Sequence, residues 1–153
     1  MPPVMASGAA RASQAGSTMN SSGGCLCAQV RYRISAPIGP LIYCHCGQCR
    51  KAQGGGFAAN VPVPKTHFEI TRGTNSVTAF RASPNKTRYF CRHCGSAIYS
   101  YLDAATNVRI RSGTLDPGSG ISPSAHIFVA SKAQWVTIDD GLNQYPEREP
   151  REA

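Results

Sequence analysis

Seven cysteines in three tight motifs constrain this chain more than any other feature of its sequence. The motifs have the spacings C-x-C, C-x-C-x-x-C and C-x-x-C, and they contain Cys25 and Cys27, then Cys44, Cys46 and Cys49, then Cys91 and Cys94. An odd number of thiols cannot all pair as disulfides within one chain, and most of these cysteines are too close in sequence to bridge each other. Closely spaced pairs on tight turns are what a tetrahedral metal–thiolate site requires. The cysteines therefore predict metal binding.

The rest of the chain has the pattern of a turn-rich β protein. Its 153 residues suit one domain, and 15 Gly and 11 Pro break it into short apolar runs. Strands are predicted at 30–34, 41–43, 57–63, 68–71, 76–80, 88–90, 97–102, 108–111 and 127–130. One helical turn or two is predicted at 48–53, ended by three glycines, with a loop at 117–123. The predicted fold class is mainly β with little helix.

Both ends of the chain differ in composition from its centre. Residues 1–22 are rich in Ala, Ser and Gly, so we expect a disordered tail before a domain at 23–145 and a polar tail at 146–153, with Met19 as an alternative start. The N-terminal segment lacks the continuous apolar run of a secretory signal, and its single Arg is too few for a transit peptide. No run reaches the roughly 18 apolar residues of a membrane span, so we expect a soluble, cytoplasmic protein.

The positive charge is concentrated in the segment that holds the cysteines. The net charge is +8, and residues 23–111 carry 12 basic side chains against 2 acidic ones. Seven thiolates with two bound Zn²⁺ ions would lower the formal charge to about +5. The remainder favours a small anionic ligand near the cysteines. It disfavours nucleic acid as a partner, because no dense Lys and Arg stripe with interleaved aromatic residues is present.

Two cysteine pairs are suited to a closed metal site. Cys91 and Cys94 flank a two-residue turn followed by Gly95, while Cys25 and Cys27 alternate along a strand end, which places both sulfurs on one face. Four sulfurs complete a tetrahedron and leave no position for a substrate, so the predicted role is structural. Buried free thiols are the alternative, and four cysteines in two such turns disfavour it.

The third motif, with Cys44, Cys46 and Cys49, supplies three thiolates and leaves a fourth position open. A catalytic zinc has this arrangement, with water or a substrate thiolate as the fourth ligand. The predicted helix start and the cations Arg50 and Lys51 would keep the sulfurs ionised. The alternative is a second structural zinc, completed by His45 or by another histidine.

The remaining polar and aromatic candidates have simpler interpretations. His45 and His93 lie inside the cysteine motifs and are expected to point away from the metal, and His67 is expected at the surface. His126 could line a pocket, but a lone histidine is more often a hydrogen-bonded polar group. Trp135 is expected in the core or at its rim. Gly54, Gly55 and Gly56 are not followed by Lys-Ser/Thr, so they do not form a phosphate loop.

These motifs together resemble the glutathione-dependent formaldehyde-activating enzyme family, which includes centromere protein V. The resemblance runs from about residue 23 to residue 135. It is carried by Gly23-Gly24-Cys25-Leu26-Cys27 with Val30-Arg31-Tyr32, Cys44-His45-Cys46-Gly47-Gln48-Cys49-Arg50-Lys51 with Gly56-Phe57, Arg88-Tyr89-Phe90-Cys91-Arg92-His93-Cys94-Gly95-Ser96, Gly113-Thr114-Leu115-Asp116, and His126-Ile127-Phe128 with Trp135. All seven family cysteines have a counterpart. Ala28 departs from the pattern, because the family often has glycine after its C-x-C.

The resemblance implies a β-tent fold of small antiparallel sheets around two zinc ions. Cys25, Cys27, Cys91 and Cys94 would bind the structural ion, and the cysteines at 44, 46 and 49 the catalytic one. Zinc is favoured over iron by the thiolate ligands and a reducing cytosol.

The family's founding activity joins glutathione and formaldehyde in S-(hydroxymethyl)glutathione, a carbon–sulfur lyase-type reaction. We therefore expect an enzyme in which the open zinc binds and ionises a small anionic thiol such as glutathione, which then attacks the carbonyl carbon. A related small electrophile could take the place of formaldehyde. The alternative hypothesis is a non-catalytic zinc module that binds a thiol or a macromolecule through its basic face.

Overall fold

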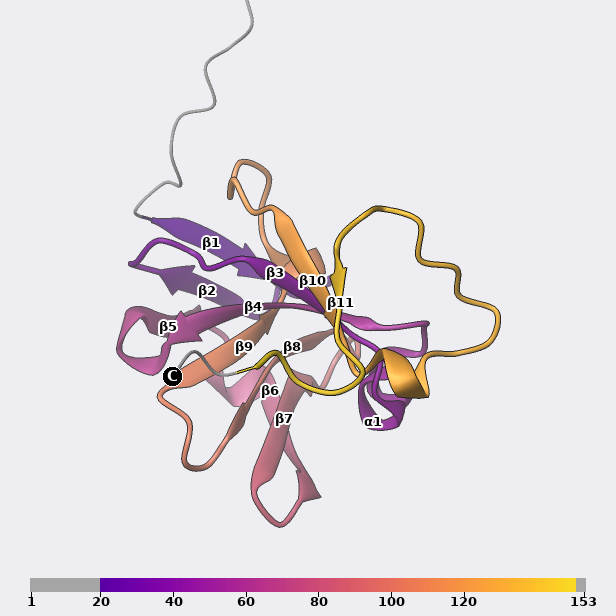
Figure 1. The fold of residues 1–153 in the computed structure, drawn as a ribbon. Helices are drawn as coiled ribbons and strands as arrows, with labels where there is room; N and C mark the ends of the chain where they lie inside the picture. Colours follow the sequence, from indigo (N-terminus) through magenta and orange to yellow (C-terminus); the bar gives the residue numbers. More distant parts are fainter. Residues whose placement is uncertain (1–19, 151–153) are drawn as a thin grey trace, which may run out of the picture.

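Two β-sheets and one short α-helix make up residues 20–150, the part of the chain that the computed structural model describes (Figure 1). The smaller sheet has three antiparallel strands in the order β1-β2-β5, which span Ser21–Gly24, Arg31–Ile34 and Phe68–Arg72. Tyr32 and Ile34 alternate with Arg31 and Arg33 in β2, and the two apolar side chains are buried. The predicted basic and apolar faces of this strand are therefore confirmed.

The larger sheet has the strand order β11-β10-β3-β4-β9-β8-β7-β6. Its strands are β3 (Leu41–Cys44), β4 (Ala58–Pro64), β6 (Val77–Ser83), β7 (Lys86–Cys91), β8 (Ala97–Leu102), β9 (Asn107–Arg111), β10 (Pro123–Ile127) and β11 (Asn143–Gln144). β10 pairs in parallel with both β3 and β11, and the other pairings are antiparallel. The predicted mainly β fold is confirmed, with one sheet larger and more mixed than expected.

Between residues 20 and 150, helical structure is confined to short segments. Helix α1 spans Gly47–Gln53 and ends at Gly54, whose φ of 66° lies in the left-handed region that glycine adopts without strain. Four single-turn 3₁₀ helices occupy Lys65–His67, Thr74–Ser76, Ser112–Thr114 and Val129–Ser131. The predicted helix and its glycine stop are confirmed, with a start one residue earlier.

Several predicted boundaries are wrong, and two of the differences have a clear physical cause. β1 begins at Ser21, so Ser21 and Ser22 belong to the first sheet and not to the segment expected to precede the fold. The strand predicted at 127–130 lies earlier, at Pro123–Ile127, because Phe128 has a φ of 57° that ends the ladder and begins a 3₁₀ turn. Residues 1–19 and 151–153, which hold most of the expected N-terminal tail and the end of the C-terminal one, lie outside the described residues. Residues 146–150 of the expected C-terminal tail are described, and the amides of Phe128 and Ala130 donate to the carbonyls of Glu147 and Pro146.

The hydrophobic core joins the two sheets. Val30, Tyr32 and Ile34 from the β2 region meet Val61, Val63, Ile98 and Ile110 from β4, β8 and β9, and all seven are at most 1% exposed. A smaller apolar cluster contains Cys44, Cys49 and Ala58, with Cys46 and Phe128 packed against it. The three cysteines of the middle motif are thus held at a junction between β3, β4 and α1.

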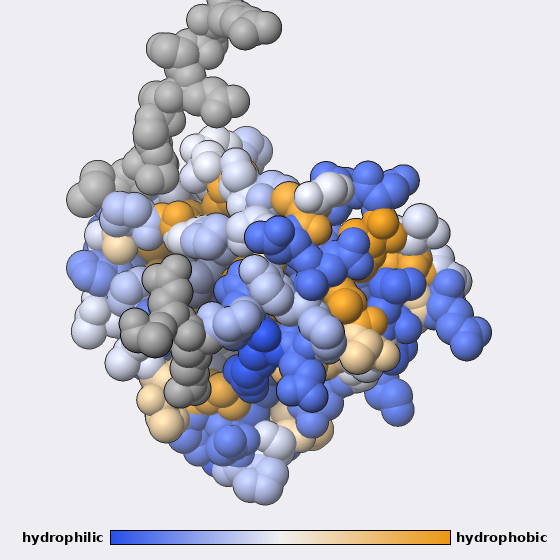
Figure 2. Space-filling model, in the orientation of Figure 1, coloured by the Kyte–Doolittle hydropathy of each residue, from blue (hydrophilic) through white to orange (hydrophobic). Residues whose placement is uncertain are grey.

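The surface view shows mainly hydrophilic residues, with apolar side chains gathered on the side of α1 and of the chain after β10 (Figure 2). Trp135 is 74% exposed and its ring lies against Gly56, so the indole is a surface group rather than a core residue. Within residues 20–150, no helix has the length and apolar character needed to cross a membrane.

Candidate metal centres

The first and last cysteine pairs meet in one four-sulfur cluster. The Sγ atoms of Cys25, Cys27, Cys91 and Cys94 all lie within 4.8 Å of one another. Neighbouring sulfurs are 3.6 Å apart between Cys25 and Cys27, and 3.7 Å apart between Cys27 and Cys91. A tetrahedron with metal–sulfur bonds of about 2.3 Å has edges of about 3.8 Å, so this donor set fits a tetrahedral metal such as zinc.

Backbone turns hold these four sulfurs in place. The Val30 amide donates to Cys25 Sγ at 3.2 Å, and the Gly95 amide closes the Cys91 turn at 2.8 Å. Gly95 has a φ of 76°, as the sequence pattern predicted for a turn that curls under a metal. Hydrogen bonding by the side chain and amide of Ser96 lowers the pKa of Cys94 to about 5, which favours the thiolate that a metal binds.

The middle motif forms a second cluster of three sulfurs. Cys44 ends β3, Cys46 is the N-cap of α1, and Cys49 lies in its first turn. The Cys46 sulfur accepts a hydrogen bond from the Cys49 amide at 3.3 Å. Hydrogen bonds from Cys44 and Cys46 lower the pKa of Cys49, burial opposes the shift, and Lys86 and Arg88 add to it. One thiolate is therefore favoured here even before a cation is bound.

A row of four cations lies on the sheet face beside the three sulfurs. Lys86 and Arg88 alternate along β7, Arg109 and Arg111 alternate along β9, and Ser100 of β8 pairs with both Arg88 and Arg109. Alternate residues of a strand share a face, so all four side chains project from the same side. The signal was present in the sequence as R-x-R within one predicted strand and as K-x-R, whose Lys86 precedes another, but only the strand order places these pairs opposite the cysteines.

Burial raises the free energy of keeping these four side chains charged, so their presence indicates an anion nearby. Desolvation lowers the pKa values of Lys86 and Arg109, and it lowers that of Arg111 to about 10, while the nearby thiolates oppose the shifts. Arg88 donates to Cys49 Sγ at 3.8 Å. Buried cations persist where anions compensate them, so the row matches the thiolate cluster and any anion that joins it.

The three sulfurs and three of the four cations line one cleft of about 870 Å³. Cys44, Cys46 and Cys49 form one part of the wall, and Lys86, Arg109 and Arg111 another. Arg148, near the end of the described chain, also lines the cleft, and its guanidinium lies 5.7 Å from the ring centre of Phe128. The cleft has the size that small-molecule sites have.

The histidines of the two motifs lie outside both sulfur clusters. His45 is fully buried, and its Nε2 lies 2.8 Å from Nδ1 of His126, whose Nε2 lies 2.8 Å from a carboxylate oxygen of Asp140. Burial, followed by the charge of His126, lowers the pKa of His45 to about 4, so its imidazole is neutral. The hydrogen bonds between His45, His126 and Asp140 connect the end of β3 with β10. The sequence predicted a hydrogen-bonded His126, but its local pattern did not identify His45 as the partner.

Each of the other two histidines has one ring nitrogen within hydrogen-bond distance of a serine hydroxyl. His93 Nε2 lies 3.1 Å from the Ser76 hydroxyl, and His67 is exposed with Nδ1 3.2 Å from the Ser35 hydroxyl. The expected surface position of His67 is confirmed.

Comparison with known proteins decides the family. The sequence model of the glutathione-dependent formaldehyde-activating enzymes matches residues 20–131, most of the chain. The chain belongs to this family. A crystal structure of a Rhodobacter sphaeroides protein shares the fold, with a TM-score of 0.50 and 15% identity over 81% of this chain and 98% of that chain. The resemblance inferred from the cysteine motifs is thus confirmed, and both cysteine clusters could hold metal ions.

Proposed function

We propose that the protein is a zinc enzyme of the carbon–sulfur lyase type that joins glutathione and formaldehyde in S-(hydroxymethyl)glutathione. One observation carries the proposal: three cysteine sulfurs and three cations of the row share a cleft of small-molecule size. Cys44, Cys46 and Cys49 would hold a zinc with one open position. Cys25, Cys27, Cys91 and Cys94 would hold a second, structural zinc.

The donor atoms support zinc at both positions. Both clusters consist of sulfur ligands, and sulfur sites of tetrahedral geometry select zinc or iron–sulfur centres. Seven cysteines that form no disulfide are typical of proteins in a reducing compartment, so we place the protein in the cytoplasm. When bound at the open position, zinc would supply a cation that ionises a substrate thiol at neutral pH.

The positive charge beside the three sulfurs favours an anionic substrate. Three thiolates with one divalent ion carry a formal charge of −1, whereas Lys86, Arg88, Arg109 and Arg111 carry +4. Arg88 and Arg111 are nearly buried, but Lys86 and Arg109 are half-buried and line the open cleft. They are placed to bind the two carboxylates of glutathione through charge-assisted hydrogen bonds.

The reaction itself requires little more than positioning. The glutathione thiol loses its proton to solvent, its sulfur attacks the carbonyl carbon of formaldehyde, and the oxygen takes up a proton. A carbon–sulfur bond forms, the carbonyl π bond breaks, and the reverse reaction releases both reactants. Holding the thiolate and the aldehyde in one cleft lowers the entropic cost of their encounter.

The alternative, a module that binds a macromolecule through a basic face, has less support. A nucleic-acid surface presents exposed cations to the phosphate backbone. Here Arg88 and Arg111 are at most 8% exposed. Three cations of the row, Lys86, Arg109 and Arg111, line the cleft. The geometry favours a small ligand.

Exchange spectroscopy with ¹³C-formaldehyde and glutathione tests the proposal. The zinc-loaded protein should accelerate interconversion of free formaldehyde and the adduct, and Cys46→Ser should abolish the acceleration while the fold is retained. Lys86→Gln should raise the KM for glutathione about tenfold, since a charge-assisted contact is lost, with little change for 2-mercaptoethanol. Arg33→Gln, exposed and paired with Glu69 on the small sheet, is the matched control. An unchanged exchange rate with the zinc-loaded protein would refute the activity.

A further inference from the structure

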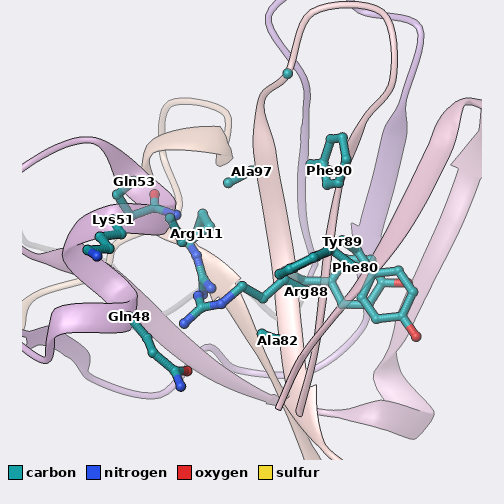
Figure 3. A pocket seen from close by; sticks show the side chains of 13 residues that line it. Gln48, Lys51, Gln53, Phe80, Ala82, Arg88, Tyr89, Phe90, Ala97 and Arg111 are labelled. Atoms are coloured by element: carbon teal, nitrogen blue, oxygen red, sulfur yellow. The ribbon is translucent and has the colours of Figure 1, made fainter.

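A second cavity lies between α1 and the face of β6, β7 and β8, next to the cleft of the three cysteines. Its volume is about 400 Å³, and Gln48 and Arg111 line both spaces. Figure 3 shows its side chains, with the helix on one side and the strands on the other. The lining residues are Gln48, Lys51, Ala52, Gln53, Phe80, Ala82, Arg88, Tyr89, Phe90, Gly95, Ala97, Tyr99 and Arg111.

Strand register gives this cavity apolar walls. Phe80 of β6 pairs with Arg88 of β7, and Phe90, two residues further along β7, pairs with Ala97 of β8. Residues directly opposite on neighbouring strands share a face, so these side chains project toward α1. Phe80 is 60% exposed and stands at the solvent side, while the small side chains of Ala82 and Ala97 leave the space open. The result is a cavity of about 400 Å³ with apolar walls on its strand side.

Two buried guanidinium groups lie at the inner end of the cavity, where they approach each other in Figure 3. Arg88 is 8% exposed; its Nη2 faces Cys49, and its Nη1 is buried with no hydrogen-bond partner among the described residues. Arg111 is 5% exposed; its Nη atoms donate to Asn60 and Ser100, and its Nε is likewise buried without a partner. Native structures rarely leave such donors unpaired, so each calls for an acceptor.

The charge of the lining identifies the acceptor. Three of the lining residues, Lys51, Arg88 and Arg111, are cationic, and none of the lining residues is acidic. Two free N–H donors from two guanidinium groups match the two oxygens of one carboxylate. The Cys49 sulfur accepts a hydrogen bond from Nη2 of Arg88 only, so Nη1 of the same guanidinium still lacks an acceptor.

We propose that this cavity binds a small carboxylate with a flat apolar body, its oxygens on Arg88 Nη1 and Arg111 Nε and its body between Phe80 and Phe90. The site goes beyond the proposed function, because it lies behind the guanidinium pair rather than in the cleft that holds the thiolates. Its ligand class is an aryl carboxylate of the size of benzoate, which suits a cavity of about 400 Å³.

Titration of the zinc-loaded protein with benzoate, followed by amide chemical shifts, tests the site. Benzoate should bind and shift the amides of α1 and β7, while acetate and benzyl alcohol should bind at least tenfold more weakly. If acetate binds as tightly as benzoate, the apolar body does not contribute to binding, and that part of the proposal is overturned. If benzyl alcohol binds as tightly as benzoate, the carboxylate does not contribute, and that part is overturned. No saturable shift with benzoate would overturn the whole proposal.

Two variants locate the binding. Ala82→Trp fills the cavity and should lower benzoate affinity at least tenfold, whereas Ala79→Trp, exposed on the opposite face of β6, should leave it unchanged. Phe80→Ala removes an exposed wall residue without adding bulk, and should lower the affinity about threefold or more. Unchanged affinity in Ala82→Trp or Phe80→Ala would overturn this location. Formaldehyde–glutathione exchange, measured separately on the wild-type protein, keeps failure of the proposed function distinct from failure of this one.

Discussion

Ala28 shows how one residue can carry a backbone constraint. It follows Cys27 in the turn after β1 and has a φ of 61°, in the left-handed region that only glycine occupies freely. Its amide donates to the Cys25 carbonyl at 3.0 Å, which closes the turn around the first sulfur pair. The turn therefore requires the conformation that glycine would adopt without strain, and this chain forms it with alanine.

Replacing this alanine is expected to stabilise the protein. Ala28→Gly should raise the free energy of unfolding by about 1 kcal/mol, because the Cβ strain at positive φ is removed. Ala52→Gly in α1 should lower it by about 1 kcal/mol, because glycine is a poor helix former. Denaturant unfolding of the zinc-loaded variants measures both. An Ala28→Gly protein less stable than the wild type would contradict the strain at this turn.

At the level of secondary-structure elements, the Asp116 carboxylate connects the small sheet to the segment that follows β9. Asp116 accepts hydrogen bonds from Arg31 of β2 and, at 2.6 Å, from the Ser22 hydroxyl of β1, and its amide donates to the Ser22 carbonyl at 2.9 Å. The hydrogen bond from Arg31, then that from Ser22, lowers the pKa of Asp116. The contact holds the strand that leads into Cys25.

This contact gives a pH-dependent contribution to stability. A carboxylate whose pKa is lowered by folding stabilises the native state above its unfolded pKa of about 4, and loses this effect as pH falls through the lower folded value. Asp116→Asn should cost about 0.5–1 kcal/mol at pH 7, because both side chains are about one-third exposed. The cost should shrink below about pH 4.

Denaturant unfolding from pH 8 to pH 3 measures this difference. Asp139→Asn, at an exposed carboxylate, is the control and corrects for the release of metal in acid. A cost for Asp116→Asn that does not change with pH would contradict the role of the ion pair.

Strand alternation was readable from the sequence, but strand ends were not. The β2 pattern predicted its buried Tyr32 and Ile34 correctly. Ser21 and Ser22 were missed because a polar Ser-Ser-Gly-Gly strand has no apolar alternation and forms through its pairing with β2. Phe128 was placed in a strand because its aromatic side chain favours one, whereas its left-handed backbone depends on tertiary contacts.

The candidate site was predictable where its residues are close in sequence. Both cysteine groupings follow from spacing and from the family pattern, and the structure brings the sulfurs of each group together. The cation row and the His45–His126 contact depend on strand order, which places His126 against His45, 81 positions away, and Arg88 against Cys49, 39 positions away. Local spacing contains no information on such pairings.

For the whole molecule, β7 connects the two centres. Cys91 ends this strand and belongs to the four-sulfur cluster, while Arg88, three residues earlier, contacts Cys49 of the three-sulfur cluster. Cys91 is fully buried in the main core, whereas the three-sulfur cluster lines an open cleft. Loss of the first metal should therefore disturb the core and the second site, and loss of the second metal should leave the core intact.

Metal content measured together with circular dichroism tests the division into a structural and an open site most directly. The wild type should bind two zinc ions per chain, and Cys46→Ser should bind one and keep the native spectrum. Cys94→Ser should lose the native fold and both ions, because a structural zinc contributes folding free energy outright. A wild type with one zinc, or a Cys46→Ser protein that unfolds as completely as Cys94→Ser, would contradict the account.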